Sequence, residues 1–156
     1  MSQALEGIST ITGDERPRIW RFSHSAGPVR SKFLLHLRDQ QKIMGTKCTT
    51  CGRVYVPARS TCLMCFEDIS NWIEVSHEGI LTTFTIVHES QPSLKYDAPF
   101  TLGIIKLDGA DTGVVHRLSE IDLEKISIGM RVKAVFKDDL KGDIWDIQYF
   151  KPVDNA

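Results

Sequence analysis

The sequence of 156 residues lacks the short motifs by which many enzymes can be recognised. It contains no H-x-E or H-E-x-x-H metal motif, no G-x-S-x-G nucleophile motif, and no glycine-rich loop of the Walker or dinucleotide-binding kind. Its five histidines lie in five separate contexts. The sequence therefore gives no sign of a catalytic centre of its own.

Long apolar runs are also missing. No run approaches the roughly 18 residues that a membrane-spanning helix needs, and the first residues are polar and mixed in charge, unlike a secretory signal. We therefore expect a cytoplasmic protein without a membrane partner. Because disulfides are disfavoured in the cytosol, paired cysteines in such a protein indicate metal binding or redox chemistry.

Four cysteines carry the strongest functional signal, as two C-x2-C pairs separated by ten residues: Cys48, Cys51, Cys62 and Cys65. Two such pairs supply a tetrahedral shell of four thiolates, with metal–sulfur bonds of about 2.3 Å. The shell admits zinc or rubredoxin-like iron, which visible absorbance would distinguish, and we favour zinc. Four ligands leave no open position for catalysis, and a thioredoxin-type role needs only one pair at a helix start. The sequence thus predicts one structural Zn²⁺ per chain.

Charge is distributed unevenly, although the formal net charge is only -1. Residues 16–47 contain eight basic residues and one acidic residue, a net charge of +7, whereas residues 66–156 contain nine basic and sixteen acidic residues, a net charge of -7. This asymmetry indicates that the N-terminal arm faces an anionic ligand or partner, or is simply a solvated basic surface.

Within the basic segment, helical spacing after Gly27-Pro28 predicts an amphipathic helix that ends at Gly45. Its apolar face consists of Val29, Phe33, Leu34 and Leu37, with Gln41 next on the same face. Its basic face consists of Arg30, Lys32, Arg38 and Lys42. An aromatic pair, Trp20 and Phe22, precedes the helix and is suited to docking against a surface.

Downstream of the cysteines the sequence is rich in strand signals. The predicted strands are 72–88 (curved at Gly79), 100–107, 113–118, 132–136 and 144–150, with a short helix over 119–126. This order is expected of an OB-fold barrel. The predicted fold class is therefore mainly β: an N-terminal helical arm (1–45), a rubredoxin-like zinc ribbon (46–70), and a five-stranded OB-fold barrel with one short helix (71–156).

Two histidines near predicted strands remain as candidates for chemistry. His88, followed by Glu89 near a strand end, could orient a substrate, although a polar strand end explains the pair more simply. His116 is expected to point out of the barrel. Neither histidine supplies a recognisable catalytic group.

Taken together, the sequence resembles a family of zinc-ribbon OB-fold proteins, long classed as a domain of unknown function, that accompany thiolase-superfamily enzymes. The matching segments, between about residues 20 and 152, are Lys47-Cys48-x-x-Cys51-Gly52, Val54-Tyr55-Val56-Pro57-x-Arg59, Cys62 and Cys65, Trp72, residues 79–88, Ala98-Pro99-Phe100 and Gly129-Met130-Arg131-Val132. One departure is the second knuckle, where relatives often carry Pro-x-Cys-Gly and this chain has Leu63-Met64-Cys65-Phe66. It affects packing around the metal more than metal identity.

The resemblance implies a non-catalytic accessory subunit of a thiolase-superfamily complex that forms or cleaves C–C bonds in acyl-CoA substrates. In such assemblies the catalytic residues belong to the partner, and the small subunit stabilises it and helps accommodate coenzyme A. The expected assembly is a heterotetramer built on a thiolase dimer. One family member is the small subunit of benzoylsuccinyl-CoA thiolase; this chain is similar to it in arm length, but the motifs do not separate it from other members.

The phosphates and adenine of coenzyme A suggest contact residues in the arm: Trp20, Phe22, Arg30, Lys32, Arg38 and Lys42. The main alternative is a single-stranded nucleic-acid-binding module, because OB-folds and zinc ribbons both occur in such proteins. The net charge of -7 over residues 66–156 would repel a phosphate backbone, so no nucleic acid is expected. An independent acyl-CoA enzyme is disfavoured, since the chain has no cysteine nucleophile outside the metal site.

Overall fold

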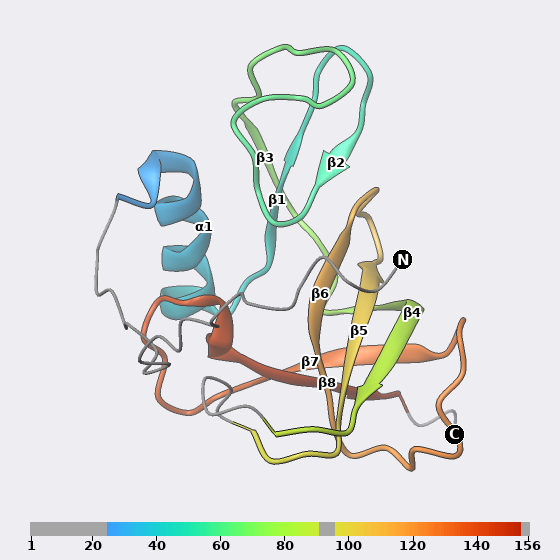
Figure 1. The fold of residues 1–156 in the computed structure, drawn as a ribbon. Coiled ribbons are helices and arrows are strands. Elements are labelled where there is room, and N and C mark those ends of the chain that lie inside the picture. The colour runs from blue at the N-terminus through green and yellow to red at the C-terminus, as the bar shows by residue number, and fades with distance from the viewer. Residues whose placement is uncertain (1–24, 91–95, 154–156) are drawn as a thin grey trace, which may run out of the picture.

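The computed structural model describes residues 25–90 and 96–153. One helix lies beside a small three-stranded sheet that stands above a closed five-stranded barrel (Figure 1). The expected mainly β fold, with a four-cysteine ribbon and a five-stranded barrel, is confirmed. Among the described residues, no helix combines the length and apolar character needed to cross a membrane.

Helix α1 (Gly27–Gln40) buries Phe33 and Leu37 and packs against β1 and η1, in line with the predicted apolar face. It ends earlier than expected, at Gln41, whose left-handed backbone (φ 51°) lets its N–H donate to Leu37 O at 3.1 Å. Gly45 is therefore not the helix stop. It lies in β1, where a Cβ atom would come within 3.0 Å of a Val54 methyl carbon, so glycine there permits close strand packing.

The three-stranded sheet places β1 (Met44–Lys47) between β2 (Val54–Tyr55) and β3 (Asn71–Glu74), both antiparallel to it. Since β3 pairs with β1, it belongs to the ribbon sheet and not to the barrel. The single curved strand expected over 72–88 is therefore wrong. Gly79 lies inside the following strand, where a Cβ atom would stand 2.3 Å from Lys106 O, so this glycine allows close strand approach. The domain boundaries at 45/46 and 70/71 stay a prediction.

The barrel is formed by β4 (Glu78–Val87), β5 (Phe100–Leu107), β6 (Gly113–Leu118), β7 (Arg131–Phe136) and β8 (Ile147–Pro152). Their order around the barrel is β4-β5-β6-β8-β7, and β7 pairs with β4 to close it. The contact between β6 and β8, here called the seam, has a single parallel residue pair, Leu118 with Phe150. The Ser119 N–H reinforces the seam by donating to Phe150 O at 2.9 Å.

The short helix expected over 119–126 does not form, and the segment consists of bends and turns. Glu120, at its start, has a left-handed backbone (φ 54°), and its carboxylate binds the Tyr149 hydroxyl and Lys151 of β8. The Asp122 carboxylate accepts from the Glu124 N–H at 3.1 Å, a local turn that competes with helix formation. Between β7 and β8 lies one 3-10 turn, η1 (Ile144–Asp146).

One hydrophobic core runs from the helix through the base of the ribbon into the barrel. Its buried residues include Phe33 and Leu37 of α1, Val54 and Val56 of the ribbon, and Leu81, Ile105 and Phe150 of the barrel. The ribbon tip has a separate, much smaller cluster of Cys48, Tyr55, Cys62 and Ile69. The base of the ribbon is thus part of the main fold, whereas the tip has little apolar packing.

The turn between β5 and β6 connects the barrel to β2 of the ribbon. The Asp111 N–H donates to Val54 O at 2.9 Å, and the Asp111 carboxylate accepts from the Val54 N–H at 2.8 Å. The Thr112 hydroxyl accepts from the Val56 N–H at 2.8 Å and donates to Val56 O at 2.9 Å. These four bonds continue the ribbon sheet onto the barrel.

Replacing Thr112 with valine tests this connection, because the change keeps the shape of the side chain and removes its two hydrogen bonds. Partly buried Val56 N–H and C=O groups would lose their partner, so we expect a loss of about 1 to 2 kcal/mol in the free energy of unfolding. Chemical denaturation measures the loss of stability, and hydrogen exchange should show a faster rate at the Val56 amide. Thr85→Val, at an exposed position on β4, is the matched control. Equal effects of the two changes would contradict the role given to Thr112.

Candidate metal centre

The two cysteine pairs adopt the same backbone turn. In the first knuckle, residues 48–53, the Cys48 N–H donates to Arg53 O and the Gly52 N–H donates to Cys48 O, both at 2.9 Å. In the second, residues 62–67, the Cys62 N–H donates to Glu67 O at 2.9 Å, and the residue-66 N–H donates to Cys62 O at 3.0 Å. The C-x2-C spacing therefore produces two equivalent loops that face each other.

Phe66 occupies in the second knuckle the place that Gly52 has in the first. Both residues have left-handed backbones, with φ 74° at Gly52 and 59° at Phe66. Glycine adopts this conformation readily, whereas an L-residue with a side chain loses roughly 1 to 2 kcal/mol. Where relatives often carry glycine after the last cysteine, this chain therefore has a strained aromatic residue next to the metal site.

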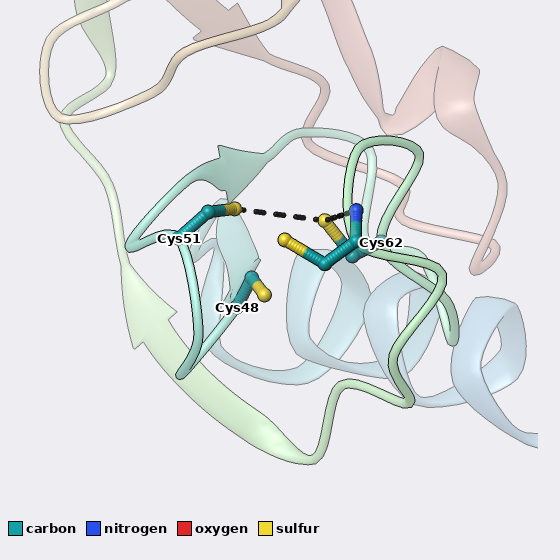
Figure 2. A group of neighbouring side chains, drawn as sticks. Cys48, Cys51 and Cys62 are labelled. Atoms are coloured by element: carbon teal, nitrogen blue, oxygen red, sulfur yellow. Dashed lines mark hydrogen bonds between the residues drawn. The ribbon is translucent and has the colours of Figure 1, made fainter.

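The four cysteine sulfurs converge at the ribbon tip. All four Sγ atoms lie within 4.8 Å of one another, and Cys51 and Cys62 Sγ are 3.6 Å apart. Figure 2 shows the Cys48, Cys51 and Cys62 side chains turned toward a common point. A tetrahedron with metal–sulfur bonds of about 2.3 Å has edges of about 3.8 Å, so the spacing fits one ion. Four thiolates and no open position fit a structural zinc ion.

Hydrogen bonds around Cys62 form a second layer of the site. The Met64 and Cys65 N–H groups each donate to Cys62 Sγ at 3.4 Å. The buried Tyr55 hydroxyl lies 3.2 Å from the same sulfur and accepts from the Leu63 N–H at 3.1 Å. Because its oxygen already accepts that bond, the hydroxyl can direct its proton at a Cys62 thiolate. Such bonds orient a ligand and stabilise its charged form.

These bonds change the acidity of the metal-free thiols. The hydrogen bond with Tyr55 lowers the pKa of Cys62 to about 6. The hydrogen bond with Cys51, together with burial, raises the pKa of Cys65 to about 12. Of these two neighbouring thiols, Cys62 therefore loses its proton more readily than Cys65 and forms the thiolate first. A zinc ion would displace the remaining protons and bind all four sulfurs as thiolates.

Tyr55 is the functional residue that the sequence analysis did not identify. There it was named only within the segment Val54-Tyr55-Val56-Pro57-x-Arg59, and in the structure it lies in β2. Its position four residues after Cys51 and seven before Cys62 contains a weak signal. A strand that connects two knuckles must pass beside both, so a side chain with a polar tip there can reach a ligand sulfur.

The basic residues predicted to contact coenzyme A are mostly engaged within the chain. Lys32 Nζ lies 4.6 Å from the Trp72 ring centroid, Lys42 pairs with Glu74 at 2.6 Å, and Arg38 pairs with its neighbour Asp39 at 2.7 Å. Arg30 is exposed at the start of α1 and forms no ion pair with another described residue. Trp20 and Phe22 lie outside the described residues.

His116 does not point out of the barrel, contrary to the sequence-based expectation. It is 3% exposed and packs edge-on against Trp145 and Phe150. Residues of β6 alternate between exposed and buried, with Val115 outward and His116 inward. Burial lowers the pKa of His116, which favours the neutral ring. His88 is exposed just after β4, as a polar strand end would be.

Tyr55→Phe should weaken zinc retention by about tenfold, because the Cys62 thiolate loses a hydrogen bond while the aromatic packing is kept. Competition with a chromophoric chelator would measure the change in apparent zinc affinity. Tyr149→Phe removes a hydroxyl that binds Glu120, on the barrel, and serves as the matched control. Unchanged zinc affinity in Tyr55→Phe would show that the hydroxyl does not stabilise the thiolate.

Comparison with protein families gives two consecutive matches. Residues 36–70 match the ChsH2 rubredoxin-like zinc ribbon domain, and residues 72–137 match the ChsH2 C-terminal OB-fold domain. Together they cover the ribbon and most of the barrel, in the order in which the structure has them.

Among curated proteins, a DUF35 domain-containing scaffold protein of Methanocaldococcus jannaschii is 32% identical over 131 residues, which is 77% of this chain and 88% of that protein. A protein of the same description from Pyrococcus furiosus is 28% identical over 105 residues, 67% of this chain and 76% of that protein. The similarity to the first extends over nearly its whole length.

Solved structures agree with these matches. A DUF35-family protein of unknown function from Sulfolobus solfataricus has a TM-score of 0.62 and 28% identity, covering 81% of this chain and 87% of that chain. The Ltp2-ChsH2(DUF35) aldolase has a TM-score of 0.60, covering 83% and 98%, but at 22% identity the likeness concerns the fold alone. The chain belongs to the DUF35 family, in which a rubredoxin-like zinc ribbon is joined to an OB-fold domain.

Proposed function

We propose that this protein is a non-catalytic accessory subunit that binds and stabilises an enzyme of the thiolase superfamily acting on acyl-CoA. The observation that carries the proposal is the closed four-thiolate site in a relative of DUF35 scaffold proteins. Such a site holds a fold together and offers no position for a substrate. The aldolase complex with a similar fold also contains a DUF35 chain, which supports an accessory role.

The described part of the chain offers little else for catalysis. His116 is buried among aromatic rings, and His88 stands alone at a strand end. The cysteines all belong to the metal site. A protein that acts on acyl-CoA without its own nucleophile or acid–base pair depends on a partner for the chemistry.

Coenzyme A contact is the finer part of the proposal. A groove of about 430 Å³ lies between the start of α1 and the second knuckle, and Arg30 and Arg59 both line it together with Ser60 and Thr61. Among residues 25–90 and 96–153, no acidic side chain lines this groove. Two guanidinium groups and two hydroxyls suit the phosphates of coenzyme A. Arg30 is the one residue of the predicted basic face that lines the groove. Lys32 and Arg38 lie further along α1, and Lys42 follows the helix.

Purification of the tagged chain from its native host, at native expression level, should yield a stoichiometric thiolase-sized enzyme subunit. Activity of that subunit with acyl-CoA should fall when the chain is removed. Cys62→Ser should abolish the assembly, because the ribbon tip depends on zinc for its fold. Recovery of the chain without any enzyme subunit, or an intact Cys62→Ser complex that has lost only turnover, would contradict the accessory role.

Arg30→Glu should weaken coenzyme A binding by the assembled complex about tenfold, since a charge-assisted hydrogen bond contributes about 1.5 kcal/mol or more. Isothermal titration of the complex with coenzyme A is the measurement. Lys133→Glu makes the same charge change at an exposed position on β7 and is the control. Unchanged affinity in Arg30→Glu would remove the groove from the coenzyme A site and leave the accessory role untouched.

A further inference from the structure

The second knuckle exposes three large apolar side chains within four residues. Leu63 is 54% exposed, Met64 61% and Phe66 81%. At the corresponding turn of the first knuckle stand the exposed polar residues Thr49 and Thr50. The two knuckles have the same backbone conformation, and the first one forms it with polar residues. The metal site therefore does not require apolar residues at these positions of the second knuckle.

Phe66 has a left-handed backbone conformation, which is unfavourable for a residue with a side chain. Its φ of 59° is the conformation that Gly52 adopts at 74° in the other knuckle. At 81% exposure, the aromatic ring gains little from packing that would compensate for the strain. Strained non-glycine residues that persist at a surface point to function, since the surrounding structure must enforce them. The ring is therefore suited to a contact made with another molecule.

The knuckle presents these side chains from a rigid backbone. The Leu63 N–H donates to the Tyr55 hydroxyl, and the N–H groups of Met64 and Cys65 donate to Cys62 Sγ. The Phe66 N–H donates to Cys62 O. With zinc bound, the loop is fixed before any partner arrives, so little conformational entropy is lost on docking.

Acidic residues border the apolar patch. Glu67 and Asp68 follow directly, both exposed, and neither carboxylate forms an ion pair with another described residue. A complementary surface therefore needs an apolar pocket with basic residues at its edge. A second copy of this chain fits poorly, because a symmetric contact would bring the same acidic residues against each other.

We propose that the second knuckle is a docking surface for the enzyme subunit of the complex. Leu63, Met64 and Phe66 insert into an apolar pocket of that subunit, and lysine or arginine side chains at the rim of the pocket face Glu67 and Asp68. This inference rests on the proposed function, since it takes the occupant to be the enzyme subunit. It adds the place of contact and the chemistry of the partner surface.

Phe66→Gly separates a docking role from a structural one. In the free chain it should keep the zinc content and leave the melting temperature unchanged or higher, because glycine relieves the strained backbone. The dissociation constant of the complex, measured with the purified enzyme subunit, should nevertheless rise at least tenfold. Ile128→Ser alters an apolar residue that is 67% exposed in the turn before β7 and should leave this constant unchanged. Wild-type affinity in Phe66→Gly would overturn the proposal.

Hydroxyl-radical oxidation of Met64 identifies the occupant. We expect Met64 to be oxidised in the purified chain and protected once the enzyme subunit is added. Protection already in the purified chain would assign the surface to residues 1–24 or to a second copy and would overturn the proposal, as would continued oxidation in the complex.

The salt dependence of the association rate tests the role of the acidic residues Glu67 and Asp68 independently. Glu67→Lys combined with Asp68→Lys should slow association with the enzyme subunit and reverse the salt dependence of the association rate. If the wild-type chain assembles with an enzyme subunit but the knuckle variants bind equally well, only the docking surface is wrong. If the wild-type chain assembles with no enzyme subunit, the proposed function fails and the docking surface fails with it.

Discussion

The bond between one metal ion and four cysteine sulfurs is the constraint on which the ribbon tip depends. Apart from the cysteines, the tip buries only Tyr55 and Ile69, too little apolar surface to fold by itself. Structural zinc supplies roughly 10 kcal/mol or more in small zinc-binding peptides, which is ample for a loop of this size. Tyr55 joins the metal to the fold, because its backbone pairs with β1 while its hydroxyl reaches Cys62.

Below the tip, the chain behaves as one folded unit. The main core includes helix, ribbon and barrel residues, and the β5–β6 turn hydrogen-bonds to β2. The helix is also attached to β3 through the contact of Lys32 with Trp72, and the residues just after the helix are attached through the ion pair of Lys42 with Glu74. Part of the basic charge that looked available for ligands in the sequence is therefore used within the chain. This leaves the start of the helix as the place where a guanidinium group borders a groove.

The features that could not be predicted from the sequence depend mainly on contacts between residues that are far apart in the chain. The cysteine spacing, the apolar spacing of α1 and the strand-rich second half were sufficient for the zinc ribbon, the helix and the barrel. Pairing of β3 with β1 is invisible in local sequence, so a ribbon strand was joined to the first barrel strand. The prediction of a helix over 119–126 was wrong because the Glu120 carboxylate binds Lys151 of β8. The outward direction expected for His116 was wrong because the alternation along β6 turns this side chain inward.

Strand β6 has a different anchor at each end. The turn before it is hydrogen-bonded to the ribbon through Thr112, and its last residue forms the single pair of the seam with β8. A structural change at either end must therefore act on the same six-residue strand, Gly113–Leu118. Because this strand is held by the ribbon at one end and by the seam at the other, any free-energy coupling between zinc binding and closure of the seam is reciprocal, so that each changes the other by the same factor.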